Sequence, residues 1–420
     1  MVKKYNRKDC ENLLKRQFFY AQAFEIYGGV SGLYDYGPLG SALKANVENA
    51  WRQHFILEDD MLEMTCTNMV LSDVLKASGH VDKFADFMVK DLKVGNCHRA
   101  DKLIDEFVTK TLSKKKALKP EEREALETLQ RDCEQFNEKQ LDEAIKQYNI
   151  KAPDTGNDLS EAVAFNLMFE AQIGPTGQLK GYLRPETAQG IFLNFRRLLD
   201  FNNGKMPCAG AQIGTGFRNE IHPRQGLLRV REFSMGEIEH FVDPLDKSHP
   251  KFYTVADDTL PLWSADAQEV NGEVISDLNL KQALEKGVIM NETMAYFMAR
   301  SFRFLTSVGV KAEAIRYRQH RSKEMAHYAQ DCWDAEVETS YGWIEVAGHA
   351  DRSAFDLKKH AEKTNVDLNA ARQLKEPKKV NVIFVSLDKK KLGTTFRKDS
   401  KPICEAVDKW TEDEKVTYLQ

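Results

Sequence analysis

The sequence lacks the features that identify several large classes of protein. No apolar stretch approaches the roughly 18 residues that a membrane span requires, so we expect no membrane association. The seven cysteines are scattered and never spaced as C-x-x-C, which excludes a zinc ribbon and favours free thiols in a reducing compartment. The glycine-rich stretch 27–40 contains neither G-x-G-x-x-G nor G-K-[ST], and therefore predicts a tight connection that leads into a helix.

Length and charge set further limits. With 420 residues, of which 42% are hydrophobic and 30% charged, the chain is typical of a globular protein with more than one domain. The net charge of −4 indicates that any nucleic acid would bind to local patches. The basic N-terminus lacks the apolar core of a secretory signal, and Asp9 and Glu11 argue against a mitochondrial presequence without excluding one. We therefore expect a cytoplasmic protein.

The stretch 217–239 predicts a β-hairpin whose basic loop contains Pro223 and Gly226, residues typical of turns. From Arg229 onward the pattern has a period of two, so every second side chain lies on one face. That face carries Arg229, Arg231, Phe233, Met235, Glu237 and Glu239. Arginines, an aromatic ring and carboxylates in this order suit a phosphate chain, a flat base and an ammonium group. The alternative interpretation is a solvated edge hairpin held by salt bridges.

A second candidate site follows Arg184. Pro185 restricts Arg184 to extended geometry, and Thr187 is predicted to cap the helix that follows. Glu186 would then be held at a strand-to-helix junction, facing a ligand or merely capping the helix. Apolar periodicity predicts the other elements: helical spacing over 9–26, a helix over 41–55, a strand over 61–71, charged helices within 97–158, a helix over 291–306 and a strand over 341–346.

The hairpin resembles motif 2 of the class II aminoacyl-tRNA synthetases, in the form carried by the eukaryotic-type, dimeric glycyl-tRNA synthetases. The matching residues are Phe217-Arg218-Asn219-Glu220, Arg229-Val230-Arg231-Glu232-Phe233 and Glu237-Ile238-Glu239-His240-Phe241. Gly37-Pro38, with the helix and strand after it, resembles motif 1 of the same class. The resemblance extends over most of residues 12–400.

This resemblance implies an α+β fold in which an antiparallel sheet is flanked by helices and interrupted by two insertions. The implied segments are 1–96 with motif 1, the helical insertion 97–158, the core 159–244 with motif 2, a second insertion 245–315, and the last part of the core, 316–420. It also implies a homodimer with Pro38 at its interface.

The implied activity is the ligation of glycine to tRNA-Gly, with ATP and Mg²⁺. Glycine and ATP would form glycyl-adenylate, from which the glycyl group passes to the tRNA. By resemblance the ATP-binding residues are Arg218, Asn219, Glu220, Arg229, Val230, Phe233, Glu345 and Val346, and Glu345 also serves Mg²⁺. Arg218 would hold the α-phosphate, Glu220 the adenine amino group, Arg229 the β- and γ-phosphates, and Phe233 would stack on adenine. Glu186 and Glu237 would bind the glycine ammonium group.

The sequence departs from the family pattern in two places. His349 stands where the family usually has cysteine, and residues 354–420 contain no Glu-Pro-Ser followed by Gly-x-Gly-Arg, the third motif of these enzymes. The motif-3 arginine and its strand contribute to ATP binding, so the activity of a chain without them is expected to be impaired. The alternatives are a catalytically inactive paralogue that binds tRNA or protein, and a fragment of a longer enzyme.

Overall fold

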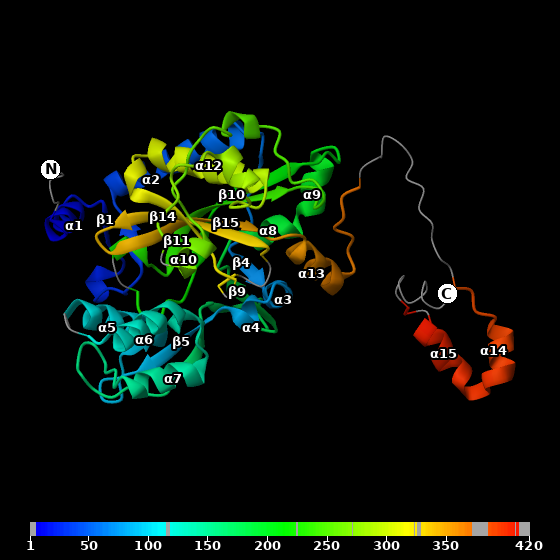
Figure 1. Cartoon of the computed structure of the whole chain (residues 1–420), viewed down its shortest axis with the longest axis horizontal. Coiled ribbons are helices and arrows are strands. Elements are labelled where there is room, and N and C mark those ends of the chain that lie inside the picture. Colours follow the sequence, from blue (N-terminus) through cyan, green and yellow to red (C-terminus); the bar gives the residue numbers. More distant parts are fainter. Residues whose placement is uncertain are drawn as a thin grey trace. The chain divides into compact units, whose positions relative to one another are not determined.

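The structure, a computed structural model, describes residues 6–114, 118–223, 226–270, 272–322, 324–325, 329–371, 385–407 and 409–410. The chain forms two compact units, Met1–Ala370 and Ala371–Gln420. The division falls inside the expected segment 316–420. In the second unit the described helices are α14 (Lys389–Phe396) and α15 (Ser400–Val407) (Figure 1). All elements discussed below belong to the first unit.

The predicted hairpin is formed by two long strands. Strand β10 (Cys208–Phe217) pairs antiparallel with β11 (Glu232–Phe241), from Cys208 opposite Phe241 to Phe217 opposite Glu232. The short strand β3 (Leu62–Glu63) pairs in parallel with the other edge of β10. This register places the β11 side chains of Phe233 and Glu237 opposite Gly216 and Gln212 of β10, and all four share one face.

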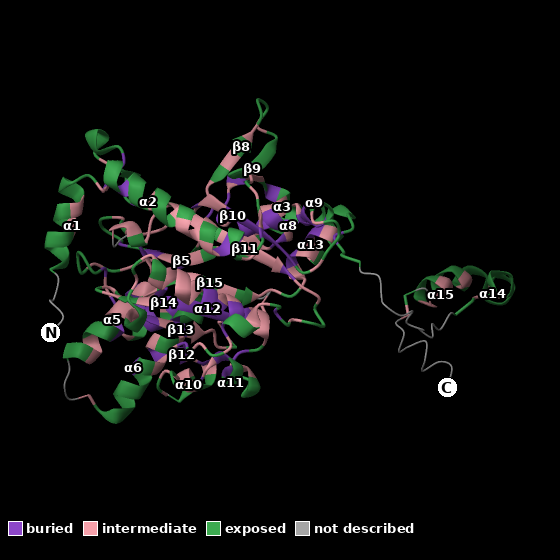
Figure 2. Ribbon diagram, turned by 90° about the horizontal axis from the view of Figure 1, so that it is seen from above, coloured by how far each residue is buried: buried purple, intermediate pink, exposed green. Residues whose placement is uncertain are grey.

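A second sheet has the order β12-β13-β14-β15. Its strands are β12 (Leu262–Trp263), β13 (Ile315–Gln319), β14 (Asp331–Thr339) and β15 (Gly342–Asp351), and only the β12–β13 pair is parallel. Both views of the chain place β14 and β15 beside the β10–β11 hairpin (Figures 1 and 2). The α+β fold expected from the resemblance is confirmed.

Helix α12 (Glu292–Ser307) covers one face of the second sheet, and the helix predicted over 291–306 is confirmed. It shares a buried apolar cluster with Tyr317 of β13 and with Trp333 and Ala335 of β14. The Tyr317 hydroxyl donates a hydrogen bond to the carbonyl of Met298, 2.7 Å away. Because side chains alternate along a strand, the residues between these face the other side of the sheet, among them Asp334 and Glu336.

Helix α2 (Pro38–Trp51) starts with Pro38 in its first turn and continues into the π-helical segment Arg52–Leu57, so the helix predicted over 41–55 is confirmed. Its last turns pack on the hairpin: a Cβ at Gly236 would lie 2.7 Å from the Trp51 indole. Its first turns are exposed (Figure 2). The exposed side chains include Leu39 (47%), Leu43 (56%) and Val47 (36%).

Three helices cover the opposite face of the hairpin: α8 (Ala188–Leu193), α9 (Phe195–Phe201) and α13 (Phe355–Thr364). They share a buried apolar cluster with Phe241 of β11. Glycines on β10 permit the close approach, because a Cβ at Gly210 would lie 2.6 Å from the Ile191 side chain.

Residues 97–158 contain three helices: α5 (Ala100–Lys114), α6 (Pro120–Asp132) and α7 (Glu138–Gln147). Their apolar sides pack on one another and on Val89 of strand β5 (Ala85–Lys90) to form a buried cluster of their own. Further helices and strands of this unit are α3 (Ser72–Ala77), α4 (His80–Lys83), β6 (Cys97–Arg99), β7 (Val163–Asn166), β8 (Glu170–Ile173), β9 (Leu179–Leu183), α10 (Ala265–Glu269) and α11 (Leu280–Glu285).

The helix predicted over 9–26 is wrong beyond its first part. Helix α1 (Arg7–Arg16) ends early, and Phe18, with a φ of 48°, turns the chain. Strand β1 (Tyr20–Gln22) then pairs antiparallel with β2 (Tyr34–Tyr36). Tertiary pairing has overridden a local helical pattern.

The single strand predicted over 61–71 is also wrong, because β3 and β4 (Met69–Leu71) are short strands in different sheets. Between them, side chains satisfy the backbone: the carbonyls of Cys66 and Thr67 accept hydrogen bonds from Arg184, at 3.0 and 3.3 Å.

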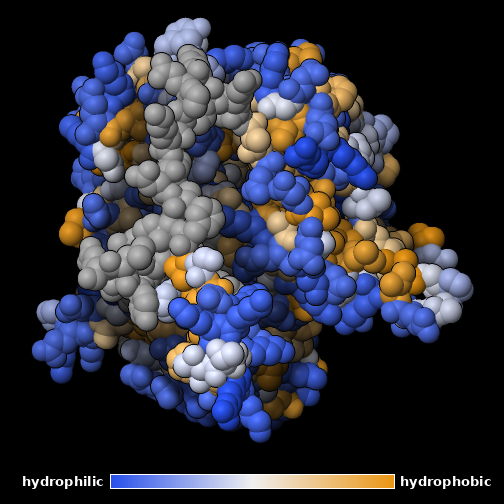
Figure 3. Space-filling view, turned by 90° about the vertical axis from the view of Figure 1, so that its right-hand side faces the viewer, coloured by the Kyte–Doolittle hydropathy of each residue, from blue (hydrophilic) through white to orange (hydrophobic). Residues whose placement is uncertain are grey.

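No helix among the described residues combines the length and apolar composition needed to cross a bilayer. On the face displayed in Figure 3, apolar residues gather in separate patches among hydrophilic ones.

Substitution of Gly37 tests the packing that sets the start of α2. A Cβ there would lie 1.8 Å from the carbonyl oxygen of Phe18. Since backbone atoms cannot move aside, we expect Gly37→Ala to lower the free energy of unfolding by about 3 kcal/mol or more in urea denaturation. At the control position Gly348, the nearest atoms would lie 3.6 and 3.7 Å from a Cβ, an ordinary contact distance. An equal effect of Gly37→Ala and Gly348→Ala would contradict this explanation.

Candidate functional site

The Arg218 guanidinium lies at the centre of the predicted site residues. Arg218 directly follows β10, and its guanidinium carbon is 5.5 Å from the centre of the Phe84 ring and 5.3 Å from that of Phe233. Its Nε donates a hydrogen bond to the carbonyl of Pro185, at 3.3 Å. Burial raises the pKa values of the Glu237 and Glu345 carboxyls, and the positive charge of Arg218 offsets part of that increase in both. The structure therefore brings Arg218, Phe233, Glu237 and Glu345 together.

The predicted alternating face is correct only within β11. Phe233 and Glu237 share a face, but the strand begins at Glu232, so Arg229 and Val230 lie in the preceding loop. Arg231 anchors this loop: its guanidinium donates hydrogen bonds to the carbonyls of Ser31 (2.6 Å) and Glu220 (2.8 Å). Its backbone N–H donates to the carbonyl of Gly32, at 2.7 Å. The Arg231 carbonyl still accepts a hydrogen bond from the N–H of Arg218, at 3.0 Å, so the backbone pairing of the hairpin continues one residue beyond the two strands.

Glu220 and Arg229 belong to a second group, beside the ion pair formed by Asp86 and Arg99. Nη1 of Arg99 lies 2.8 Å from Oδ2 of Asp86. Burial raises the pKa of Asp86, the Glu220 charge raises it further, and the Arg99 and Arg229 charges lower it. Asn219 is held between the two groups by its backbone N–H, which donates to the carbonyl of Leu167 at 2.7 Å.

Glu186 and Glu237 belong to one partly buried cluster of side chains, which we call the carboxyl pocket. Nε2 of His80 is 3.4 Å from Oε1 of Glu186. The Thr187 hydroxyl donates a hydrogen bond to Oε2 of Glu237, at 3.1 Å. The predicted capping role of Thr187 is therefore wrong: its side chain makes no cap hydrogen bond with the helix, because the hydroxyl is directed at Glu237. The predicted single helix after it is also divided, at Asn194, into α8 and α9.

The two carboxyls differ in their affinity for a proton. Burial alone would raise the pKa of Glu186, but the hydrogen bond and charge of His80, with the Arg352 charge, lower it to about 2. Burial, followed by the Glu186 charge, raises the pKa of Glu237 to about 7. One of the two is thus ionised at neutral pH while the other titrates there.

Two further charged residues complete this pocket. Glu239 shares the face of Glu237 on β11, and burial raises its pKa well above the usual range despite the charge of Arg352. Arg352 donates two hydrogen bonds to Asp356 on α13, at 2.9 and 3.1 Å. The pocket thus contains the carboxyl groups of Glu186, Glu237 and Glu239, while the guanidinium of Arg352 is already paired with a fourth carboxyl group, that of Asp356, and this arrangement favours a cationic ligand.

Glu345 and Val346 lie on β15 at a β-bulge. Glu336 of β14 pairs with Glu345, and the next residue, Ala335, pairs with Ala347, so Val346 is the extra residue. Glu345 shares a face with Asp334 and keeps exposed surface. Removal of its carboxyl from water, and then the nearby Asp334 charge, raise the pKa of Glu345, while the Arg218 charge offsets part of this increase.

His349 lies on the other face of β15, away from Glu345. It pairs with Trp333, and its Nε2 is 2.7 Å from the Ser301 hydroxyl on α12. Burial lowers the pKa of His349. The departure from the family pattern at this position therefore affects the packing of α12 on the sheet, not the site.

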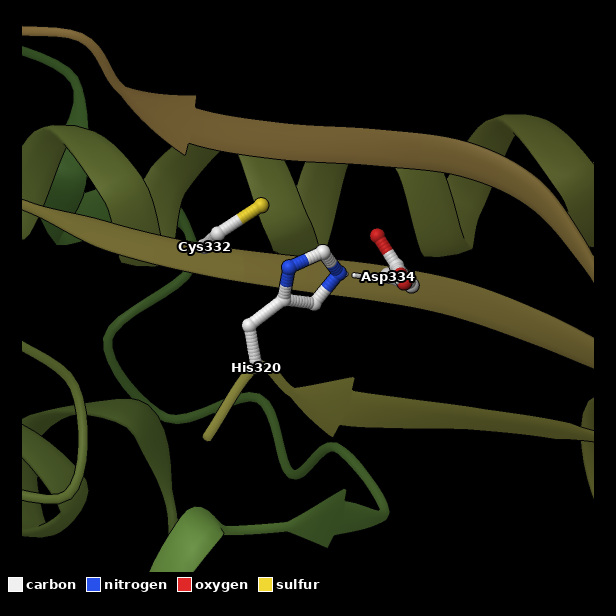
Figure 4. Close-up of side chains that lie close together, drawn as sticks. All are labelled: His320, Cys332 and Asp334. Atoms are coloured by element: carbon white, nitrogen blue, oxygen red, sulfur yellow. Dashed lines mark hydrogen bonds and ion pairs between the residues drawn. The ribbon is translucent and has the colours of Figure 1, made fainter. Parts of the chain in front are cut away.

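His320, Cys332 and Asp334 form the one group of potential metal ligands among the described residues (Figure 4). The His320 ring lies between the thiol and the carboxylate, with Nε2 2.7 Å from Oδ2 of Asp334. That hydrogen bond, more than any other cause, raises the pKa of His320 to about 10, so the imidazole is protonated at neutral pH. Arg318 also approaches Asp334, to 3.5 Å. This arrangement fits an ion pair better than a metal centre.

Sequence reasoning assigned no role to three members of the pocket, Glu239, Gln189 and Arg352. Glu239 was detectable, because it continues the period-two face of Glu237. Gln189 and Arg352 had no comparable signal. The Gln189 amide donates to Glu186 at 2.9 Å, but its other partners come from α13, which is remote in sequence.

Comparison with known proteins identifies relatives along almost the whole chain. Residues 176–382 match the tRNA synthetase class II core domain (G, H, P, S and T). The chain is 54% identical to the glycine–tRNA ligase of Caenorhabditis elegans, covering 98% of this chain and 55% of that protein. It is 52% identical to that of Drosophila melanogaster (98% and 54%) and 42% identical to that of Methanocaldococcus jannaschii (97% and 68%). The chain thus spans about half the length of the two animal relatives.

The raised pKa of Glu237 predicts a pH-dependent cost to folding. A carboxyl with a raised pKa contributes stability below its unfolded value, and this contribution is lost as the pH rises through the folded value, here about 7. Glu237→Gln should therefore raise the free energy of unfolding by about 2 kcal/mol at about pH 8, with little effect at about pH 5. Urea denaturation at the two pH values measures this difference. The exposed Glu285→Gln is the control, and an equal pH profile for both variants would contradict the assignment.

Proposed function

This chain belongs to the glycine–tRNA ligase family of class II tRNA synthetases, and from that premise we propose that it activates glycine with ATP and transfers it to tRNA-Gly. In the first step a carboxylate oxygen of glycine attacks the α-phosphorus in line, and pyrophosphate leaves with the electron pair of the broken P–O bond. In the second step a terminal ribose hydroxyl of the tRNA attacks the glycyl carbonyl and AMP leaves. The carboxyl pocket beside Arg218 is the observation that carries this proposal.

The amino acid would bind in the pocket of Glu186 and Glu237. A glycine ammonium group carries three donors and one positive charge, and both carboxyls accept hydrogen bonds there. An arriving cation would favour the ionised form of Glu237 and release its proton. No alternative function is favoured by any observation on the described residues.

The nucleotide would extend along the site from Arg218. In this proposal Arg218 holds the α-phosphate, Phe233 stacks on adenine and Glu220 accepts from the adenine amino group. Arg229 would hold the β- and γ-phosphates; the backbones of Asn219 and Val230 complete the loop. The position of Arg218 beside the Phe233 ring and near Glu237 supports an order in which the phosphate lies between amino acid and base.

Mg²⁺ would be held by Glu345, next to Val346, through the ATP phosphates. The raised pKa of Glu345 reflects a crowded carboxylate with Asp334 as its neighbour, and a divalent cation would relieve that repulsion. When bound, the ion would neutralise phosphate charge. The role of Glu345 would be to hold the ion in position beside the phosphates.

A homodimer formed through α2 is part of the proposal. The exposed apolar residues Leu39, Leu43 and Val47 follow Pro38 on the first turns of the helix, where a partner copy would cover them. We also propose that 97–158 and 245–315 are insertions in the catalytic core formed by 1–96, 159–244 and 316–420. A cytoplasmic location fits the seven free cysteines.

Glycine-dependent ATP–pyrophosphate exchange by the purified chain tests the first step. We expect Arg218→Ala to lower the exchange rate by about 10²–10³-fold, because the transition-state charge on the α-phosphate loses its hydrogen-bond donors. Arg196→Ala, an exposed arginine on α9, should exchange like the unchanged chain. Exchange that survives in Arg218→Ala would contradict the role of Arg218, and no exchange by the unchanged chain would contradict activation by this chain.

Sedimentation velocity tests the dimer. Leu43→Asp would place a charge in the proposed apolar interface, where its desolvation is costly, so we expect a monomer. Leu245→Asp is the matched control, because Leu245 is 96% exposed and lies outside α2. A monomeric unchanged chain, or a Leu43→Asp variant that remains dimeric, would rule out this interface.

A further inference from the structure

We propose that Gln189 is a positioning residue of the amino-group pocket: its side-chain amide fixes the Glu186 carboxylate to helix α13. This inference rests on the proposed function, because it assigns to Glu186 the ammonium group of the substrate. Gln189 itself would not contact the substrate. It would act through Glu186, by determining where that carboxylate points.

The amide of Gln189 bridges two carboxylates. Its Nε2 donates hydrogen bonds to Oε1 of Glu186, at 2.9 Å, and to Oδ1 of Asp356, at 3.0 Å. Its Oε1 accepts a hydrogen bond from Nε2 of His360, at 2.8 Å. Both amide protons and the amide oxygen are therefore in use.

These partners leave one orientation for the amide. Ionised carboxylates can only accept hydrogen bonds, so a flipped amide would direct its oxygen at two carboxylate oxygens. The surroundings are nearly dry: Gln189 is 2% exposed, and Asp356 and His360 are each 3% exposed. Because little water reaches these groups, a hydrogen bond lost here would not be replaced.

The bridge links elements that are distant in sequence. Glu186 lies just before α8 and Gln189 in its first turn, three residues later, whereas Asp356 and His360 lie one turn apart on α13. Asp356 also receives two hydrogen bonds from Arg352, whose charge acts on Glu186. Helix α13 is therefore linked to Glu186 in two ways: Gln189 bonds to both Asp356 and Glu186, and Arg352 bonds to Asp356 while its charge acts on Glu186.

Glu186 contacts both Gln189 and His80, and a substitution of Gln189 would remove only the first of these contacts. Without the amide, Glu186 retains the contact with His80 at 3.4 Å and the charge of Arg352, but loses its hydrogen-bonded link to α13. Its carboxylate would then be free to rotate away from Asp356, because like charges repel. The apolar cluster that packs α8 on α13 does not depend on the amide, so the fold should survive the loss.

Calorimetric titration of the full 420-residue chain with glycine and, separately, with ATP tests this proposal. Gln189→Met keeps the length of the side chain and removes the hydrogen bonds. We expect it to weaken glycine binding by about 10- to 100-fold, which corresponds to about 1.4–2.8 kcal/mol, and to leave ATP binding within about twofold. A merely structural role would weaken both ligands together with thermal stability, and that result would overturn the proposal.

Gln268→Met is the matched control. The Gln268 amide nitrogen, on α10, likewise has several hydrogen-bond partners, but these are the backbone carbonyls of Trp263, Ser264 and Gln319. Its substitution should leave the affinity for glycine unchanged. Equal glycine affinities in the unchanged chain and in Gln189→Met would overturn the positioning role.

A crystal structure of Gln189→Met separates this inference from the proposed function. If the unchanged chain binds no glycine, the proposed function fails, and the position of Glu186 in the two structures still decides the role of Gln189. A displaced Glu186 carboxylate on an otherwise unchanged α8 supports positioning by the amide. A carboxylate in the same place overturns it, whatever the chain binds.

Discussion

The repulsion among the carboxyls of Glu186, Glu237 and Glu239 is the constraint on which the rest of the site depends. Two ionised groups about 4 Å apart cost about 4 kcal/mol at an effective dielectric constant near 20. The protein offsets part of this cost with Arg352 and with the raised pKa values of Glu237 and Glu239, which favour the neutral forms of both carboxyls. The negative charge that remains uncompensated is confined to the side of β11 that faces helices α8 and α13. A pocket of this kind is unfavourable for folding and favourable for an ammonium ligand, which is a common conflict between stability and function.

Sequence reasoning succeeded where a short-range rule and the tertiary structure agree. Phe233 and Glu237 share a face because strand alternation is enforced by the pairing of β10 with β11. It failed where a distant partner intervened. Arg231 obeys the period of two in the sequence, but the carbonyls of Ser31 and Glu220 hold its guanidinium, and the strand begins one residue later. Thr187 likewise satisfies the rule for a helix cap, yet its hydroxyl is bonded to Glu237.

The contribution of α13 could not be derived from periodicity or local propensity. Gln189 and Asp356 are 167 positions apart, and nothing in either local pattern indicates that they meet. The resemblance extends over most of residues 12–400 but does not indicate that Gln189 and Arg352 both donate hydrogen bonds to Asp356. His349 illustrates the opposite case: its departure from the family pattern is plain in the sequence, but only the register of β14 and β15 shows that it faces α12.

The geometry of β11 explains why one strand can serve both ends of the proposed adenylate. From Glu237 to Phe233 is four residues, or about 13 Å along an antiparallel strand. An amino acid joined through phosphate and ribose to a base must cover a comparable span, with the phosphate between its ends. Arg218 meets that requirement, because its guanidinium contacts the Phe233 ring while its charge acts on Glu237 and Glu345. Phe233 and Glu237 would thus serve the two ends of one ligand, while Arg218, which follows β10, would hold the phosphate between them. A Cβ at Gly216 would lie 2.9 Å from the Phe233 ring, so the glycine opposite leaves room for that ring.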